Sequence, residues 1–325
     1  MPAAHDPSVT GALFAKRSIL DNAAAMLERT SDQLAAAEAV WSQQSVWSQA
    51  ANRRKAAIGR SRAAALWLTI AGAVLAALAT QLTPLDGGWA GAGRGLALAA
   101  AVAVGLVPLL QGQLGKRAVA DWTRARSVAE TLKSEVVTYL AGVAPYRGPE
   151  RDRQLGERSD GVVAGAGDLL VHTTGIVPVA RALPPIDGLD AYVAERLTRQ
   201  IESYYRPRAA RLKVRLGRVR AAGLALGATG AVLAALAGAL GLGALAAWVA
   251  VVTTVSATLT AHAAAARYEY QLVEYLRTGA ELERLRGRRP AAGDQAGEDD
   301  FVARCESVIS IQNEGWMAKW SSADD

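Results

Sequence analysis

A row of hydroxyl and imidazole side chains lies inside one of the most apolar stretches of the sequence. Thr254, Thr258 and His262 follow one another at intervals of four residues, which places them on one face of a helix. Such side chains can line a wetted pore, and a histidine at the end of the row can titrate near neutral pH. Because hydroxyls in membrane helices often bond back to their own backbone, a pore-lining role and a purely structural role both stay open.

A second group of this kind occurs in a neighbouring apolar stretch. Gly105 and Pro108 predict a hinge, because a proline inside a helix removes a backbone hydrogen bond and favours a kink. Gln111 adds a polar group nearby and is a further candidate pore-lining residue. A discontinuous helix or a mid-membrane polar site is what a small-solute transporter would need, so these residues are the support for that less favoured alternative.

The sequence lacks the motifs of an enzyme. It has no P-loop, no GxGxxG turn with a following acidic residue, no HExxH, no CxxC and no nucleophile elbow. One cysteine, Cys305, excludes an internal disulfide framework, and only three histidines are present for metal or acid–base chemistry. We therefore expect no catalytic residues, no metal site, no cofactor and no enzymatic activity.

Four apolar stretches must position the polar rows: residues 63–82, 95–115, 221–240 and 244–264. None of them contains Asp, Glu, Lys or Arg. A helix needs about 20 mostly apolar residues to cross a bilayer with its backbone satisfied. The sequence therefore predicts an all-α integral membrane protein with two parallel two-helix transmembrane hairpins, extended by long amphipathic cytosolic helices.

The placement of Lys and Arg predicts the orientation. Cations crowd before the first span, after the second and before the third, whereas the connection 83–94 carries only Arg94 and the turn 241–243 carries none. Because Lys and Arg stay on the cytoplasmic side, we expect a multi-pass protein of the cell inner (plasma) membrane with both termini cytoplasmic. The net charge of +6 comes without a nucleic-acid readout motif, so the expected partner is the lipid bilayer and not nucleic acid.

The chain divides into two similar units. The first covers residues 12–145, a Gly/Pro-rich connector covers 146–188, and the second covers 189–322. The connector permits a short helix followed by an extended stretch, and its role stays open. In the second unit, Pro207 is expected to bend the helix that leads to the membrane. A heptad pattern opens the first unit and predicts a long helix able to pack along another helix or a coiled-coil partner; it comprises Leu13, Leu20, Leu27, Leu34 and Trp41.

Small residues in the third span form possible helix-packing steps. Gly223 and Gly227 make a GxxxG pair, and Ala234 with Gly238 makes a similar pair further on. Small residues let helix backbones approach closely within lipid. Packing within one hairpin and assembly between copies of the chain both stay open.

Residues near the third span carry a resemblance to a known family. The second unit contains an R-x3-Q-x3-YY-x3-A opening motif and a closing V-x3-E…W element, formed by Arg196, Gln200, Tyr204, Tyr205 and Ala209, and by Val302, Glu306 and Trp316. These residues resemble the SLATT family, two-transmembrane domains associated with SMODS and SLOG proteins in bacterial conflict systems. The first unit resembles another branch of the family through Trp47, Ala50, Trp122, Thr123, Arg126 and Lys133. Pro207 within the opening motif departs from the family pattern.

The resemblance implies a membrane effector that forms pores when a cytosolic nucleotide signal is sensed. We therefore expect a homo-oligomeric, pore-forming or channel-like effector, gated by a cytosolic signal through a nucleotide-signalling or sensor protein. The main alternative is a non-enzymatic membrane scaffold that recruits partners through its aromatic cytosolic helices.

Overall fold

The computed structural model describes residues 7–85, 88–112, 115–291 and 293–321, with side chains described over 34–310 except at these gaps, Gln111 and Lys116. All regular structure within these residues is helical, so the prediction of an all-α fold is confirmed. The heptad residues before Leu34 fall in a helix, but their side chains lie outside the described set.

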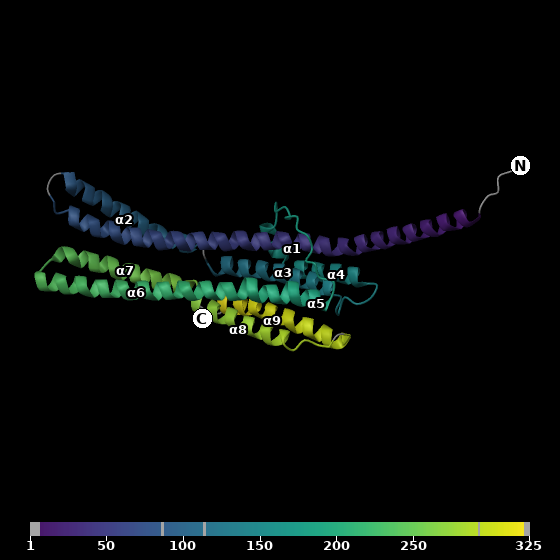
Figure 1. Ribbon diagram of the computed structural model, residues 1–325. Helices are drawn as coiled ribbons and strands as arrows, with labels where there is room; N and C mark the ends of the chain where they lie inside the picture. The colour runs from purple at the N-terminus through teal and green to yellow at the C-terminus, as the bar shows by residue number, and fades with distance from the viewer. Residues whose placement is uncertain (1–6, 86–87, 113–114, 292, 322–325) are drawn as a thin grey trace.

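Four helices contain stretches long and apolar enough to cross a membrane. They form two hairpins, drawn one above the other in Figure 1: α1 (Pro7–Leu82) with α2 (Gly88–Gly112), and α6 (Arg206–Leu240) with α7 (Gly243–Ala265). At most 17% of the residues in any apolar window are buried inside the protein. Lipid must therefore cover most of this surface, as the sequence predicts.

The four spans lie in a row. The packed pairs are α1 with α2, α1 with α7, and α6 with α7, which gives the order α2–α1–α7–α6. At the hairpin tips, Gln81 Nε2 donates a hydrogen bond to the carbonyl oxygen of Ala244 at 2.9 Å. The two ends of the row, α2 and α6, are not a packed pair within the described chain. One copy of the protein therefore encloses no central axis.

Glycines set the closest approaches inside each hairpin. A Cβ atom built on Gly72 of α1 would lie 2.6 Å from Val104 Cγ2 of α2. In the second hairpin, a Cβ atom on Gly230 would lie 3.5 Å from Val252 Cγ1. Small residues are needed where two backbones come this close, because lipid provides no hydrophobic drive to hold helices together.

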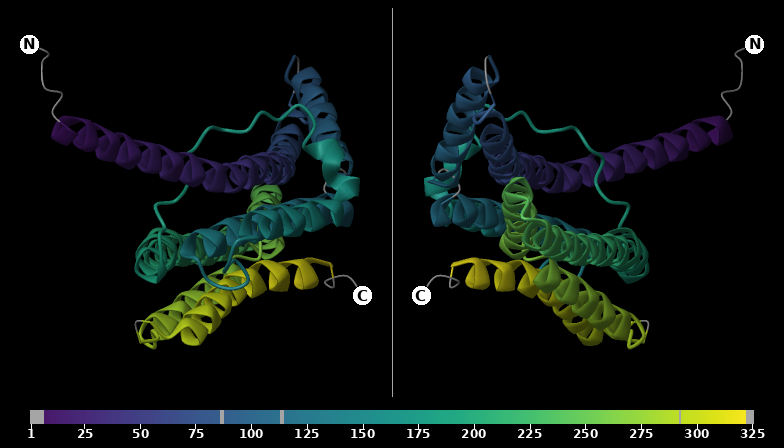
Figure 2. Two further views of the ribbon diagram at one scale, coloured as in Figure 1. Left: turned by 90° about the vertical axis from the view of Figure 1, so that its right-hand side faces the viewer. Right: turned by 90° about the vertical axis from the view of Figure 1, so that its left-hand side faces the viewer.

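A helical body adjoins the spans at the ends opposite their tips (Figures 1 and 2). It comprises residues 34–62 of α1, residues 189–220, and the helices α3 (Lys116–Ala141), α4 (Arg151–Ala164), α8 (Tyr268–Arg286) and α9 (Gln295–Ser321). The body has two hydrophobic cores, and the second one also includes Val137, Ala141 and Val143 of the first unit. Trp47 and Leu132 lie in the first core, and Tyr205 and Leu282 lie in the second.

The connector packs against the first unit. Its helix α4 and the 3-10 turn Gly167–His172 place Leu155 and Leu169 in the first core. The irregular segment that follows crosses α1 (Figure 1). There the backbone N–H of Val179 donates to Ser45 Oγ at 3.0 Å, and Gln49 Nε2 donates to the carbonyl of Val177 at 3.0 Å. Residues 146–188 therefore form part of the body rather than a separate linker.

The helices that approach the membrane are continuous, and those that leave it are interrupted. Both α1 and α6 run unbroken from the body into their spans. By contrast, Gly115 just before α3 has a non-helical φ of −50° and ψ of 163°, and Arg267 just before α8 adopts the left-handed conformation with φ of 49°. The helices α3 and α8 are therefore elements separate from the spans that precede them.

Pro207 stands in the first turn of α6, where its missing N–H is tolerated. The helix before it has wider π-type turns, over Tyr192–Thr198 and Gln200–Tyr205. Pro207, where the sequence departs from the family's opening motif, therefore lies where the helix changes from π-type to α-type turns. Turns of the π type are rare and occur often at functional sites.

Gly72→Val is expected to destabilise the first hairpin by about 1–3 kcal/mol, because the added atoms overlap Val104 and must push α2 away. Gly95→Val is the matched control, since a Cβ atom there meets nothing within 4 Å. Thermal unfolding in detergent is the measurement. Equal midpoints for the two variants would contradict the close α1–α2 packing.

Candidate functional site: a buried ion pair and a cationic groove beside the spans

The two ends of the second unit are joined by a buried ion pair. Arg196, in the π-type turn, donates from Nη2 to Glu306 Oε2 at 2.7 Å and from Nε to Glu306 Oε1 at 2.9 Å. Their side chains are only 3% and 8% exposed. Tyr192 donates its hydroxyl proton to Glu306 Oε1 at 2.9 Å. This two-pronged geometry is the strongest form of a carboxylate–guanidinium contact, and it fixes α9 against the base of α6.

The environment keeps both members of the pair charged. Burial alone raises the pKa of a carboxyl group, but the Arg196 charge and hydrogen bonds from Arg196, Tyr192 and Ser134 outweigh it and lower the pKa of Glu306. Burial by itself lowers the pKa of the Arg196 guanidinium, but the charge and hydrogen bonds of Glu306 outweigh burial and raise this pKa. Burial and the Glu306 charge raise the pKa of Tyr192 well above its usual value. The pair therefore stays ionised across the physiological range.

A small polar cavity borders this pair. Its volume is about 70 Å³. Arg196 Nη1 has no hydrogen-bond partner among the described residues. A cavity of this size admits water molecules but not an organic cofactor. The geometry of the pair is that of a structural clamp between α9 and the helix that precedes α6. The other lining residues come from α3 and α9: Ser127, Glu130, Thr131, Ser134, Glu135, Glu306, Ile309 and Ser310.

A second charged cluster lies on α3 beside the clamp. Glu130 forms a salt bridge with Arg126 one turn away. Burial raises the pKa of Glu130, and the charges of Arg126, Lys133 and Arg196 reverse this effect and lower it. Burial and the Arg196 charge lower the pKa of Lys133 to about 8, against the opposing charge of Glu130. The positive charge that Lys133 carries near neutral pH therefore lowers the stability of the folded protein.

The opening motif also packs into the second core. Tyr205 is 1% exposed and Ala209 is 3% exposed. The rings of Tyr204 and Tyr205 meet edge to face with centroids 5.2 Å apart, and both lie near Tyr275 of α8. Gln200 makes a side-chain hydrogen bond with Tyr205. These residues hold α8 against α6. Trp316 of the closing element lies in α9, with its side chain outside the described set.

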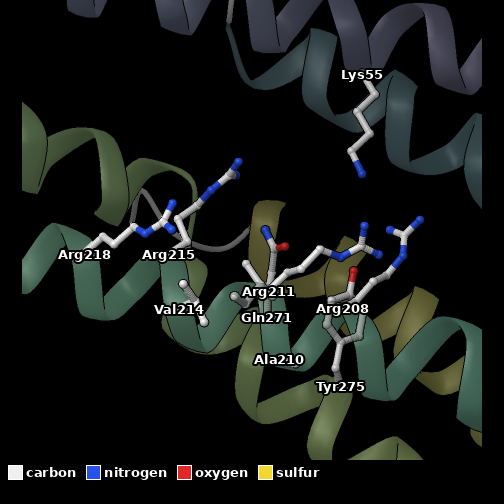
Figure 3. A pocket seen from close by; sticks show the side chains of 10 residues that line it. Lys55, Arg208, Ala210, Arg211, Val214, Arg215, Arg218, Gln271 and Tyr275 are labelled. Atoms are coloured by element: carbon white, nitrogen blue, oxygen red, sulfur yellow. The ribbon is translucent and has the colours of Figure 1, made fainter.

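A wide groove lined by cations runs beside the body, with a volume of about 740 Å³. Lys55 of α1 lines one side, and Figure 3 shows it pointing toward arginines of α6. No carboxylate is among the residues that line it in the described chain. Its lining comprises Lys55, Arg208, Ala210, Arg211, Leu212, Val214, Arg215, Arg218, Gln271 and Tyr275.

Comparison with known families identifies the second unit. Residues 192–316 match the model of the SMODS and SLOG-associating 2TM effector domain 1. The second unit belongs to the SLATT family. Residues 45–154 match a different model, described as a protein of unknown function (DUF4231). Searches of the curated proteins and of the solved structures found no match.

The family assignment gives the clamp its context. Arg196 and Glu306 both fall within the matched stretch and come from its two ends. The SLATT unit is therefore closed by a contact between its opening motif and its closing element. The sequence singled out both residues through the family pattern, but nothing in their spacing of 110 residues predicts that they touch.

The hydroxyl groups of α7 bond mainly to their own helix. Thr258 Oγ1 donates to the carbonyl of Thr254 at 2.6 Å, and Thr253 and Thr260 make equivalent bonds. Thr254 borders an apolar groove formed with α1 and α2. The ring of His262 lies 6.5 Å from that of Tyr268, centroid to centroid. In one copy of the protein, this row faces neighbouring helices rather than a closed axis.

The candidate hinge on α2 is helical. The helix continues through Gly105 and Pro108 as far as Gly112. Gln111 belongs to the last turn of α2, with its side chain outside the described set. The described residues contain no group of three or more His, Cys, Asp or Glu side chains that could hold a metal ion. Burial raises the pKa of the Cys305 thiol to about 12, which keeps it unreactive.

The candidate packing glycines do not set the contact within their own hairpin. A Cβ atom on Gly223, Gly227 or Gly238 would meet nothing within 4 Å. Ala234 is exposed. The glycine of α6 whose added Cβ atom would contact α7 is Gly230, at 3.5 Å from Val252 Cγ1, and the GxxxG pattern does not include it.

Glu306→Gln is expected to destabilise the protein by about 3–5 kcal/mol, because it leaves the Arg196 charge buried without a counter-charge. The matched control is Arg304→Gln, since Arg304 pairs with Asp300 on the exposed face of α9 and should cost less than about 1 kcal/mol. Thermal unfolding and the proteolysis rate of α9 are the measurements. Arg196→Met with Glu306→Leu should recover part of the loss. Equal losses in Glu306→Gln and its control would contradict the clamp.

Lys133→Met is expected to stabilise the protein at pH 7 by roughly 2–6 °C in the unfolding midpoint. The pKa of Lys133 is about 8 in the folded protein and 10.5 ordinarily. Between these values the unfolded chain binds more protons, so the penalty from Lys133 falls as the pH rises. The gain should therefore shrink by more than half at pH 10. Lys213→Met, at an exposed position, is the control. An equal gain at both pH values would point to packing instead of charge.

Proposed function

We propose that this SLATT protein is a non-enzymatic effector of the plasma membrane that permeabilises the bilayer as an assembly of several copies. A cytosolic signal, delivered through a nucleotide-signalling or sensor protein in a bacterial conflict system, would control it. The membrane location follows from the four spans and the effector domain. Pore formation, assembly and gating are the proposal.

The row order α2–α1–α7–α6 is the observation that carries the proposal. Four helices in a row enclose no lumen, so one copy has no path for ions through its own spans. A row also leaves both of its faces and both end helices open to lipid or to other copies. If several copies repeated this row around a common axis, their spans would form a closed ring of helices. The unit of function is therefore an oligomer, with α2 of one copy meeting α6 of the next.

The small residues of α6 support assembly between copies. A Cβ atom on Gly227 or Gly238 would stand in open space within one copy. Small residues in membrane helices are enriched where another helix approaches closely. In this proposal they receive a neighbouring copy, and the hydroxyl row of α7 becomes accessible to water only in the assembled state.

Two continuous helices supply the mechanical link. Because α1 and α6 run from the body into the membrane without a break, a movement of the body carries the spans with it. The Arg196–Glu306 clamp ties α9 to the base of α6 and so couples the body to the third span. A partner that binds the body would move the spans through α1 and α6. In this proposal the body and both termini lie in the cytoplasm.

The scaffold alternative has one specific observation in its favour. The hydroxyls of α7 are bonded to their own backbone, which is typical of dry spans. The transporter alternative needs a discontinuous helix or a mid-membrane polar site, and α2 is continuous through Pro108. A scaffold and an effector differ in conductance, so one assay separates them.

Reconstitution into dye-loaded liposomes tests the proposal. Flux is expected to rise more steeply than in proportion to the protein-to-lipid ratio, because several copies must meet. Gly227→Leu should reduce both flux and oligomer mass, because it places a large side chain in the contact. Ala225→Leu, which is also exposed on α6, should not.

The mass of the detergent-solubilised particle is the second measurement, because it does not depend on an activating signal. An oligomeric mass that Gly227→Leu lowers supports the proposal. A monomeric particle with no flux at any ratio would contradict it and favour the scaffold.

A further inference from the structure

The groove face of α6 carries an uncompensated row of positive charge. Four arginines follow one another at intervals of three, four and three residues, which places them on one side of the helix: Arg208, Arg211, Arg215 and Arg218. Like charges at these spacings repel each other. Within the described chain, no carboxylate forms a salt bridge with any of them. Their contacts within the described chain are with neutral groups: Arg208 lies over the Tyr204 ring, Arg211 donates to the Pro207 carbonyl, and Arg215 lies over the Tyr268 ring. The row therefore keeps a net positive charge that an anion can bind.

The opposite situation holds on the neighbouring face of the same helix. Arg206 lies 2.7 Å from Glu283 of α8, and Arg220 pairs with Glu269 of α8. The helix thus has carboxylate partners for Arg206 and Arg220 and none for the four arginines that line the groove.

The first unit adds a fifth cation from across the groove. Lys55 of α1 points toward the guanidinium groups of Arg208 and Arg211 (Figure 3). Partial burial and the charges of Arg208 and Arg126 lower the pKa of Lys55. Since α1 and α6 are not a packed pair in the described residues, the groove is the space between the two units. An anion bound in the groove would contact both units.

The size and chemistry of the groove fit a phosphate-bearing ligand. Its volume of about 740 Å³ lies within the roughly 300–1,000 Å³ typical of ligand pockets. Lysine and arginine side chains only donate hydrogen bonds, so the matching ligand accepts them. One guanidinium group can donate two parallel hydrogen bonds to two oxygens of a phosphate. Tyr275 and Gln271 of α8 add polar groups at the groove wall.

The groove also has a defined place relative to the membrane. Arg218 precedes the third span by three residues and Arg208 by thirteen, or about 5 Å and about 20 Å along a helix. One end therefore lies at the level of lipid headgroups and the other lies beyond them.

We propose that this groove binds an anion carrying phosphate groups and that the bound anion bridges α1 and α6. The inference goes beyond the permeabilising role and holds whether or not the spans conduct. A lipid headgroup reaches the Arg215–Arg218 end from the bilayer, and a soluble phosphate compound reaches the Lys55–Arg208 end from the aqueous side. The two sources share one recognition chemistry.

Binding of two probes to the full chain in nanodiscs tests the groove. Inorganic pyrophosphate is titrated by calorimetry into protein in phosphatidylcholine nanodiscs. Phosphatidic acid retained per protein is counted by native mass spectrometry. Arg208→Gln with Arg215→Gln should weaken binding of the recognised probe at least about tenfold, because charged hydrogen bonds are lost. Arg206→Gln with Arg220→Gln removes the same charge from α6 and should stay within about threefold of wild type.

Lys55→Gln gives an independent arm on the other unit, with exposed Arg53→Gln as its control. Variants whose unfolding midpoint matches wild type are compared, so that loss of binding is not loss of fold. Pyrophosphate binding that depends on Lys55 and Arg208 assigns a soluble ligand, and phosphatidic acid retention that depends on Arg215 assigns a lipid. Binding of neither probe would overturn the proposal, as would equal losses in the groove pair and its control pair.

Discussion

A helix that crosses lipid must satisfy its own backbone and keep charge out of the hydrocarbon, and this constraint shapes the whole molecule. The four spans contain no Asp, Glu, Lys or Arg, so the charge of the chain is concentrated in the body. There it has to be compensated or left for a ligand. The body does both. It buries the Arg196–Glu306 ion pair, and it leaves the arginines of the groove without carboxylate partners in the described chain.

These two electrostatic features have different consequences. The Arg196–Glu306 pair is matched in charge and in geometry, so it contributes specificity of packing and holds the ends of the SLATT unit together. The groove cations have no carboxylate partner in the described chain, so an anion would relieve their mutual repulsion. Both members of the clamp come from the second unit, whereas the residues that line the groove come from both units. The clamp therefore maintains each copy, and the groove is placed to alter the relation of its halves.

The arrangement of the spans gives the functional argument its direction. A closed four-helix bundle would bury most of its small residues, and its polar rows would face inward. The row found here leaves open space where a Cβ atom on Gly227 or Gly238 would stand, and it keeps the hydroxyls of α7 on their own backbone. These features are the ones that the proposed assembly of several copies would use. The helices α1 and α6 also join the body to the spans without a break, whereas α3 and α8 are elements separate from the spans before them.

The sequence by itself determined the spans, the all-α class and the family of the second unit, because apolar length and local motifs are properties of contiguous residues. It also pointed to Arg196 and Glu306, although only as members of a pattern. The tertiary structure decided which of these residues meet. Their contact joins positions 110 residues apart, and the groove joins Lys55 to arginines of the other unit. Hydropathy and spacing contain no information on such pairings.

The same division applies to the small residues and to the ends of the helices. The GxxxG pattern identified small residues, but it could not tell that Gly230, rather than Gly223 or Gly227, lies closest to the neighbouring helix. Helical spacing continues past the second span, yet Gly115 just before α3 is not helical. Local composition fixes how long a helix can be and whether it enters lipid. Its direction, its neighbours and the charges it meets depend on how two separately encoded units pack together, and only the folded chain contains that information.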